Sequence, residues 1–291
     1  MGTLFHVECL ICHASELKPL SRYSKISLVQ CQSCGFLFSR AIPHDQDLLK
    51  LYDHYGRKDY LSPITVKRYN QILNRFEKFR KTNKLMDVGC GIGYFLEAAK
   101  QRGWEVYGSE ITDEAVRICR EKGINMQQGK LDTQQYLPGS FDVVTSFEVM
   151  EHINNPKEEG QKFYTLLRNG GIMYLTTPNF NSLSRLLLKD KWTVFSYPEH
   201  LCYYTSRTIL RLFTDIGFIK ERIEATGISI TRLMKIMKSS GEKNISATST
   251  DEKLRVGFER NRIFYFLKKT LNRVLILLSA GDNLKATFVK N

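Results

Sequence analysis

The sequence predicts an α/β protein whose main part is a doubly wound, largely parallel sheet, preceded by a small module held together by cysteines. From Lys84 onward, short apolar runs alternate with amphipathic runs at helical spacing. A repeated strand–helix–strand succession implies a parallel sheet covered on both faces. Ahead of this part, four cysteines stand in two identical pairs, Cys9-x-x-Cys12 and Cys31-x-x-Cys34.

The expected elements follow one another in a regular order. Residues 1–40 form the cysteine module, residues 41–82 a helical connection, and residues 83–291 the main domain with an inserted helical segment at about 226–281. We expect strands at 27–30, 36–38, 85–88, 105–109, 141–147, 172–177, 218–224 and 284–289, and helices at 47–55, 64–79, 95–102, 114–122, 157–167, 207–215 and 260–278. Gly103, Gly123 and Gly217 follow expected helices as C-caps, and Ser206 is the expected N-cap of the helix at 207–215.

The composition bounds the class of protein. A chain of 291 residues with 42% hydrophobic and 25% charged residues is ordinary for a soluble globular protein of one α/β domain and a small module. Seven cysteines are too few for a disulfide scaffold of this size, and four of them have metal-ligand spacing, which favours a reducing cytoplasm. The N-terminus lacks the basic and apolar runs of a signal peptide, and the apolar stretch at 274–278 is far shorter than a membrane span.

A glycine-rich turn follows the first strand of the main domain. The strand ends near Asp87, and Gly89-x-Gly91-x-Gly93 leads into a helix. Glycines let the backbone approach a ligand closely because no Cβ stands in the way. The next strand ends at Glu110, whose carboxylate can accept hydrogen bonds from both ribose hydroxyls of an adenosine. The spacing departs from the dinucleotide fingerprint GxGxxG, so we interpret the turn as the site of a different adenosine cofactor.

These residues resemble the class I S-adenosylmethionine-dependent methyltransferases of the methyltransferase-23 and ubiquinone O-methyltransferase type. The resemblance is carried by Leu85-Met-Asp-Val-Gly-Cys-Gly-Ile-Gly93, Glu110 and Ser140-Phe-Asp-Val-Val-Thr-Ser-Phe-Glu-Val-Met-Glu-His152, and continues through Leu167-Arg-Asn-Gly-Gly171 and Thr177-Pro-Asn179. It implies a Rossmann-like fold with a seven-stranded sheet and S-adenosylmethionine as cofactor. The implied cofactor-binding residues are Asp87, Gly89, Gly91, Gly93, Glu110, Leu131 against adenine, and Phe147 through its backbone.

The cysteine pairs have the spacing C-x2-C-x18-C-x2-C, which fits tetrahedral thiolate coordination of a structural zinc ion by Cys9, Cys12, Cys31 and Cys34. Two incidental pairs and a redox site are the alternatives. The arrangement resembles the N-terminal zinc ribbon that precedes some methyltransferase domains, including enzymes of sugar and polysaccharide modification and certain ribosomal RNA methyltransferases.

Candidate catalytic residues follow the fourth strand of the main domain. Methyl transfer is an in-line displacement, so an enzyme mainly positions the acceptor and deprotonates it where needed. Glu148-x-x-Glu151-His152 resembles ubiquinone-pathway and small-RNA 2′-O-methyltransferases, in which such side chains hold a divalent ion, here Mg²⁺ by its ligand preference. The alternatives are His152 as general base and a purely structural role. His200 is a candidate base, fourth metal ligand or packing residue. Trp192, Phe195 and Tyr197 are expected to line an acceptor pocket or to fill a core.

Charge and sequence motifs suggest classes of partner. The chain carries a net charge of +13, concentrated in the segments before and after the acidic cofactor region, which favours an anionic partner such as nucleic acid, a phosphorylated small molecule or a membrane surface. Residues 260–278 combine Phe and Leu with Lys and Arg, as in a helix at a membrane interface or a lid. No Asn-Pro-Pro-Tyr motif follows the fourth strand, which favours a hydroxyl acceptor. We therefore expect a cytoplasmic O-methyltransferase of a small-molecule, glycan or lipid-linked acceptor, with an RNA methyltransferase or a non-catalytic binding module as alternatives.

Overall fold

The structure is a computed structural model that describes residues 4–44, 48, 61–227 and 262–291, with the side chains of the last segment described from residue 270 onward. The helix expected at 47–55 and the polar part of the expected insertion lie outside the described residues, apart from residue 48. Among the described residues, no helix is both long and apolar enough to cross a membrane.

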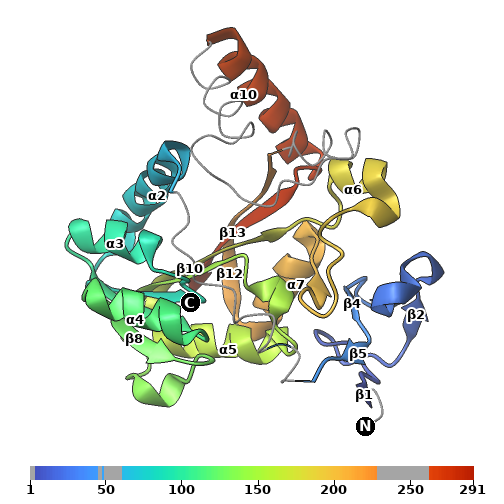
Figure 1. The fold of residues 1–291 in the computed structure, drawn as a ribbon, viewed down its shortest axis with the longest axis horizontal. Coiled ribbons are helices and arrows are strands. Elements are labelled where there is room, and N and C mark those ends of the chain that lie inside the picture. Colours follow the sequence, from blue (N-terminus) through green and yellow to red (C-terminus); the bar gives the residue numbers. More distant parts are fainter. Residues whose placement is uncertain (1–3, 45–47, 49–60, 228–261) are drawn as a thin grey trace.

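A seven-stranded sheet forms the centre of the molecule, in the order β12-β13-β10-β9-β6-β7-β8 (Figure 1). Strands β8, β7, β6, β9 and β10 are parallel, and β13 runs antiparallel to both of its neighbours. The predicted doubly wound fold is confirmed. The strands are β6 (Lys84–Val88), β7 (Glu105–Glu110), β8 (Asn125–Gln128), β9 (Phe141–Phe147), β10 (Leu167–Pro178), β12 (Phe218–Thr226) and β13 (Asn283–Lys290).

Helices cover both faces of this sheet because successive residues of its central strands are buried on opposite sides. Leu85 belongs to one core layer, with α2 and α3, while Met86 belongs to the other, with α5 and α7. The helices are α2 (Pro63–Phe76), α3 (Tyr94–Gln101), α4 (Asp113–Glu121), α5 (Pro156–Leu166), α6 (Leu183–Leu188), α7 (Ser206–Ile216) and α10 (Arg262–Leu277). Short 3₁₀ turns are η1 (Ser21–Ile26), η2 (Glu77–Phe79), η3 (Thr133–Gln135), η4 (Met150–His152) and η5 (Lys189–Lys191).

The start of α7 corrects the predicted N-cap. Thr205, and not Ser206, is the N-cap, because the Thr205 hydroxyl accepts a hydrogen bond from the N–H of Thr208 at 3.2 Å. The Thr208 hydroxyl accepts one from the N–H of Thr205 at 2.9 Å, which completes a capping box. Gly217 ends the helix with φ +114°, as its position in the sequence predicts.

The cysteine module shares a sheet with the main domain. Its strands β2 (Leu17–Pro19), β3 (Leu28–Cys31) and β4 (Leu37–Ser39) are completed by β11 (Cys202–Tyr203), which comes from the main domain. A separate pair joins β1 (Leu4–Phe5) to β5 (Ala41–Ile42). The two parts also share one hydrophobic core cluster, so the module is packed onto the domain rather than tethered to it.

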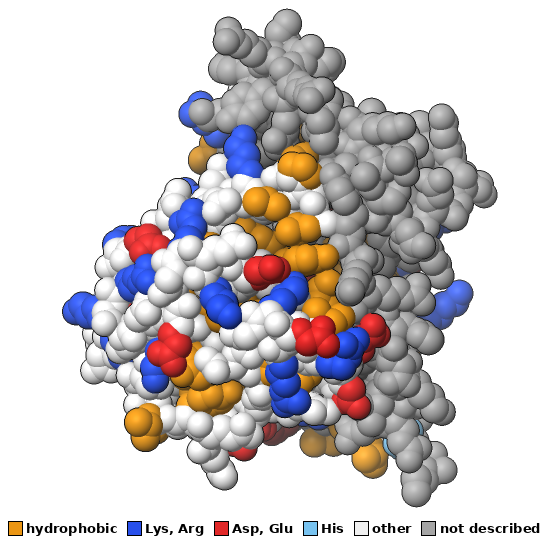
Figure 2. All heavy atoms as spheres, turned by 60° about the vertical axis from the view of Figure 1, so that its left-hand side comes forward, with side chains coloured by type: hydrophobic (Ala, Val, Ile, Leu, Met, Phe, Trp, Pro, Cys, Tyr) orange, Lys and Arg blue, Asp and Glu red, His pale blue; other side chains and the backbone are white. Residues whose placement is uncertain are grey.

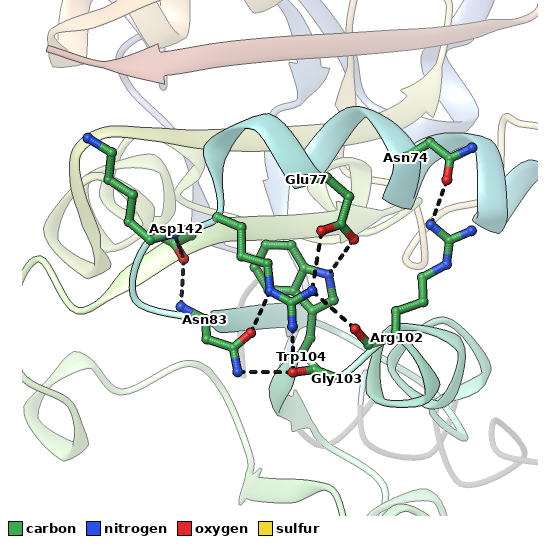
Figure 3. A network of polar contacts seen from close by, with 9 residues as sticks. Asn74, Glu77, Asn83, Arg102, Gly103, Trp104 and Asp142 are labelled. Carbon is green, nitrogen blue, oxygen red and sulfur yellow. Dashed lines mark hydrogen bonds and ion pairs between the residues drawn. The ribbon is translucent and has the colours of Figure 1, made fainter.

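A polar network anchors α2 and η2 at the amino ends of β6 and β7 (Figure 3). The indole N–H of Trp104 donates to Glu77 at 3.3 Å, and Arg102 donates to Asn74 at 2.7 Å. The N–H of Asn83 donates to the buried carboxylate of Asp142 at 2.8 Å. These contacts stabilise the end of the sheet opposite the glycine-rich turn.

Candidate active site

The glycine-rich turn joins β6 to α3 through backbone conformations that favour glycine. Gly89 and Gly93 have φ of +70° and +76°. A Cβ at Gly89 would lie 2.5 Å from a methyl of Val149, and a Cβ at Gly93 would lie 2.8 Å from the sulfur of Cys119. Larger residues at these two positions would therefore displace the turn.

Glu110 lies directly against this turn. One oxygen of its carboxylate accepts a hydrogen bond from the N–H of Gly91 at 3.0 Å, and the other accepts from the N–H of Ile111 at 2.7 Å and of Thr112 at 3.2 Å. The carboxyl ends of the neighbouring parallel strands β6 and β7 bring these residues together. The structure thus joins the two parts of the sequence-predicted adenosine site.

Asp87 is buried beneath the turn, with only 2% of its surface exposed. The Thr145 hydroxyl donates a hydrogen bond to its carboxylate at 2.7 Å. The pKa of Asp87 is raised to about 7, chiefly by burial and also by the charge of Glu110, while the hydrogen bond from Thr145 opposes both effects. A positively charged ligand group nearby would favour the ionised carboxylate, which suits a sulfonium cofactor with an α-amino group.

The sequence analysis did not single out Thr145, although a hydroxyl inside the apolar run 141–147 is a signal for a buried polar partner. Of the remaining predicted cofactor residues, Leu131 is buried among core side chains after β8. Phe147 ends β9, and its ring packs against Phe95 at 4.8 Å between centroids. The backbone-lined turn, the carboxylate at the second strand end and the buried acid together fit S-adenosylmethionine.

A second group of titratable side chains lies just beyond β9. Possible ligand atoms of Glu151, His152 and His200 all lie within 4.8 Å of one another. Glu148, which has φ +54°, is not a member of this group. The structure therefore brings His200, from a segment far along the chain, to the side chains that the E-x-x-E-H pattern singles out.

The environment of His152 keeps its imidazole neutral. Its Nδ1–H donates to the carbonyl oxygen of Glu199 at 2.8 Å, and its ring lies 4.7 Å from that of His200. Burial and the neighbouring His200 lower the pKa of His152 to about 4. Burial and then the charge of Glu148 raise the pKa of Glu151 well above its usual range, although the Thr177 hydroxyl donates to it at 2.9 Å. A neutral imidazole can accept a proton or bind a metal ion.

The four paired cysteines converge as their spacing predicts. All four sulfurs lie within 4.8 Å of one another, with 3.5 Å between Cys9 and Cys34 and 3.6 Å between Cys12 and Cys31. Tetrahedral zinc with sulfurs at about 2.3 Å separates those sulfurs by about 3.8 Å. The N–H of Ile11 also donates to the Cys9 sulfur at 3.5 Å. The donor set and its spacing fit a structural zinc ion.

Hydrogen bonds connect this module to the segment that carries His200. The N–H of Ser39, at the end of β4, donates to the carbonyl of Leu201 at 2.8 Å, and the N–H of Leu201 donates to the carbonyl of Glu151 at 2.7 Å. The ring of Phe36, two residues after Cys34, packs 5.3 Å from that of Tyr204. The segment that holds His200 against His152 is therefore itself held by the module.

Of the two interpretations of Trp192 and Phe195, the core interpretation fits the structure. Trp192 is 1% exposed, and it packs 5.1 Å from Phe195 and 6.4 Å from Phe180 in ring–ring contacts. Phe195 also contacts Tyr23 of the cysteine module at 4.6 Å. These rings fill the space between the module and the main domain.

Comparison with known proteins is consistent with this site. A family model described as a methyltransferase domain matches residues 52–221, more than half of the chain. The ubiquinone biosynthesis O-methyltransferase of Pseudomonas aeruginosa is 33% identical over 105 residues, which cover 34% of this chain and 45% of that protein. That of Saccharophagus degradans is 32% identical over 137 residues, covering 45% of this chain and 57% of the relative. The chain thus spans about half the length of these curated relatives.

Two solved structures have the same fold. Phosphoethanolamine N-methyltransferase 2 of Haemonchus contortus, in complex with S-adenosylmethionine, has a TM-score of 0.51 at 18% identity over 87% of this chain and 61% of that chain. The [4+2]-cyclase SpnF has a TM-score of 0.52 at 16% identity over 85% of this chain and 96% of that chain. Because these identities are low, the likeness concerns the fold alone.

The sheet order, the glycine-rich turn and the acidic residue at the second strand end define a class I fold that uses S-adenosylmethionine. The family match covers more than half of the sequence, and the chain belongs to the S-adenosylmethionine-dependent methyltransferases. The family predicted from the motifs is thereby confirmed.

Proposed function

We propose that the protein transfers the methyl group of S-adenosylmethionine to a hydroxyl oxygen of a small-molecule, glycan or lipid-linked acceptor. The observation that carries the proposal is the neutral His152, held beside Glu151 and His200 at the carboxyl end of β9. The relatives named as ubiquinone biosynthesis O-methyltransferases support an oxygen acceptor. Two further proposals accompany it: Gly89, Gly91, Gly93 and Glu110 hold the cofactor, and the four paired cysteines hold a structural zinc ion.

In the proposed reaction the sulfur–methyl bond breaks as an oxygen–methyl bond forms, and the acceptor hydroxyl loses its proton. S-adenosylmethionine supplies the methyl group and leaves as its thioether. His152 accepts the proton, and its bond to the Glu199 carbonyl orients the ring. An imidazole with a pKa of about 4 is a weak base, so its part is to take the proton as the oxygen becomes bonded to carbon.

A divalent cation would be an alternative to this base, because it would lower the pKa of the hydroxyl. In this alternative we propose Glu151, His152 and His200 as its ligands, because one carboxylate and two imidazoles are within reach of a single ion, and a metal-bound His152 would not accept the proton. Mg²⁺ prefers oxygen ligands, whereas this donor set suits a transition ion such as Mn²⁺ or Zn²⁺. Glu148 stays a candidate for contact with the acceptor.

Exposed apolar side chains support the proposed contact of the protein with a lipid-linked acceptor. Val274, Leu277 and Leu278 at the end of α10 are exposed, as are Leu186 and Leu187 on α6. The start of α6 contacts the turn that follows α10, where the N–H of Leu183 donates to the carbonyl of Ala280 at 2.9 Å. Peripheral membrane contact through residues 260–278 stays a prediction of this proposal.

The proposal is tested by following the methyl group. The purified protein is incubated with methyl-labelled S-adenosylmethionine and a whole-cell extract, with Glu110→Ala as the cofactor-deficient control. We expect the label in small-molecule, glycan or solvent-extractable lipid material. Nuclease-sensitive label would identify RNA as the acceptor instead, and the absence of transferred label from every fraction would contradict the proposal.

A further inference from the structure

Three cations without a paired acid lie on the face of the sheet that α2 covers. Arg68 and Arg75 stand two turns apart on α2, and Lys285 is half-buried on β13. Among the described residues, none of the three makes a hydrogen bond or an ion pair. Arg68 and Arg75 are exposed and Lys285 is half-buried, so a bound anion would stabilise chiefly the charge of Lys285.

A cavity of about 470 Å³ is lined by one of these cations, Arg75. It opens between α2 and strands β10, β12 and β13, and Arg75, Tyr174, Arg222 and Thr287 contribute to its lining. Lys285 is two residues along β13 from Thr287 and therefore projects from the same face of the sheet. On the side of the molecule that carries α2, Figure 2 shows a band of hydrophobic side chains flanked by Lys and Arg together with Asp and Glu.

Two of the carboxylates near this group are paired with other cations. Glu224 lies opposite Lys285 in the strand register, but it is already paired with Arg222 at 2.7 Å. Glu221 of the cavity is likewise paired with Lys78 at 2.7 Å. Burial lowers the pKa of Lys285, as do the charges of Arg68 and Arg75, whereas the charges of Glu224 and Glu148 oppose this shift.

Lys285 also connects the cavity to the proposed active site. Its partner across β10 is Thr176, whose carbonyl accepts a hydrogen bond from the N–H of Glu148 at 2.9 Å. A ligand that contacts Lys285 is therefore two strands away from the residue that follows β9. An acceptor with an anionic group at Lys285 can extend its hydroxyl towards Glu148 and the cofactor.

We propose that Lys285, Arg68 and Arg75 bind the phosphate group of a phosphorylated small-molecule acceptor. Three cations exceed what one carboxylate needs and match a phosphate ester of charge about −1.5 to −2. The apolar and aromatic part of the cavity wall, which includes Phe76 and Tyr174, fits an organic group attached to the phosphate. The identity of the bound molecule as acceptor rests on the proposed function, whereas the phosphate site does not.

Phosphate binding is tested by calorimetric titration of the full chain with phenyl phosphate and with inorganic phosphate. We expect phenyl phosphate to bind at least tenfold more tightly, and Lys285→Met and Arg75→Gln each to weaken its binding at least tenfold. Arg117→Gln, which removes an exposed arginine paired with Glu121 on α4, is the matched control and should bind normally. Equal affinities in the wild type and both cavity variants would overturn the proposal, as would binding of an RNA oligonucleotide but not of phenyl phosphate.

Thermal unfolding separates a binding role of Lys285 from a structural one. Without an anion, Lys285→Met should raise the melting temperature because it removes a repelled, half-buried charge, and it should abolish the further rise that phenyl phosphate gives the wild type. A lower melting temperature of the anion-free variant would show that Lys285 is structural. If Lys285→Met does not fold, the exposed Arg75→Gln carries the binding test.

The two proposals fail in different ways. Methylation of an acceptor at the same kcat/KM with and without its phosphate would overturn the phosphate proposal and leave the methyltransferase function standing. Loss of phenyl phosphate binding in Lys285→Met, with no acceptor methylated under any condition, would keep the phosphate site and overturn the proposed function.

Discussion

Replacing Asp87 with Asn should make the protein more stable and at the same time impair cofactor binding. Asp87 is 2% exposed and its pKa is raised to about 7 from an ordinary value of 3.8. The folded protein therefore retains a proton that the unfolded chain loses above pH 4, so stability falls as the pH rises from about 4 to 7 and then levels off. The shift corresponds to at most about 4 kcal/mol of lost stability above pH 7. Asn cannot ionise, and its carbonyl oxygen can still accept the hydrogen bond from Thr145.

Urea unfolding at pH 4.5 and pH 8 measures this effect. Asp87→Asn should exceed the wild type by up to about 4 kcal/mol at pH 8, and the difference should shrink towards zero at the lower pH. Calorimetric titration should show weaker binding of S-adenosylmethionine by the variant, because a neutral amide does not attract its positive charges. A variant less stable than the wild type at pH 8 would refute the account of Asp87.

Asp142 provides a control of opposite sign. It is fully buried, and desolvation raises its pKa, but hydrogen bonds from Arg168 and from the N–H groups of Lys81 and Asn83 outweigh that effect and hold the pKa below its ordinary value. The ionised Asp142 therefore contributes to the stability of the folded protein above its ordinary pKa, and this contribution is lost as the pH falls through the lower pKa of the folded state. Asp142→Asn should therefore lose roughly 1.5–3 kcal/mol at pH 8, which is the usual contribution of a hydrogen bond to a charged group.

Three further predictions concern the proposed site. Glu110→Ala should weaken S-adenosylmethionine binding at least about 100-fold, since the two proposed charge-assisted hydrogen bonds to the ribose would contribute about 3 kcal/mol or more. Unchanged affinity in a calorimetric titration would contradict the cofactor assignment. Removal of zinc by a chelator should expose the cysteine module to limited proteolysis and lower the methyl-transfer rate. Cofactor affinity should stay within threefold of its starting value, because the module holds the His200 segment and not the glycine-rich turn. An unchanged melting temperature and proteolysis pattern would contradict the zinc proposal. His152→Ala should lower kcat roughly 100-fold or more, in the usual range for a general base, with cofactor affinity unchanged; a normal kcat would exclude His152 from proton transfer.

The fold and the cofactor turn were predictable because their signals are local. Alternating strand and helix runs, glycines that end helices, and the spacing from Asp87 to Glu110 all depend on short stretches of sequence. The parallel order of the strands then brings Glu110 to the turn without further information. Thr205 and Ser206 show where local signals fail, because two adjacent hydroxyl residues are equally suited to cap a helix and only the backbone conformation selects one.

The rest of the site depends on contacts between residues far apart in the chain. The two-residue strand β11 has no periodic pattern of its own, and its pairing with Leu37 and Phe38 could not be foreseen. The same segment brings His200 to His152, 48 positions earlier in the chain. Glu148, although part of the E-x-x-E-H pattern, stands apart from the clustered ligand atoms because the chain turns at a positive φ before η4. Lys285 gave no signal because one lysine in a short strand is ordinary until its neighbours are known.

The fate of the methyl group tests the central claim most directly, because the fold alone does not specify methyl transfer; the structurally similar SpnF is named a cyclase. The protein is incubated with S-adenosylmethionine that carries a deuterated methyl group, together with the acceptor fraction found by labelling, and the product is analysed by mass spectrometry and NMR. The account predicts a deuterated methyl on an acceptor oxygen and an equal amount of S-adenosylhomocysteine. Cofactor that is bound but remains intact in the presence of every acceptor fraction would contradict it and identify the chain as a binding module.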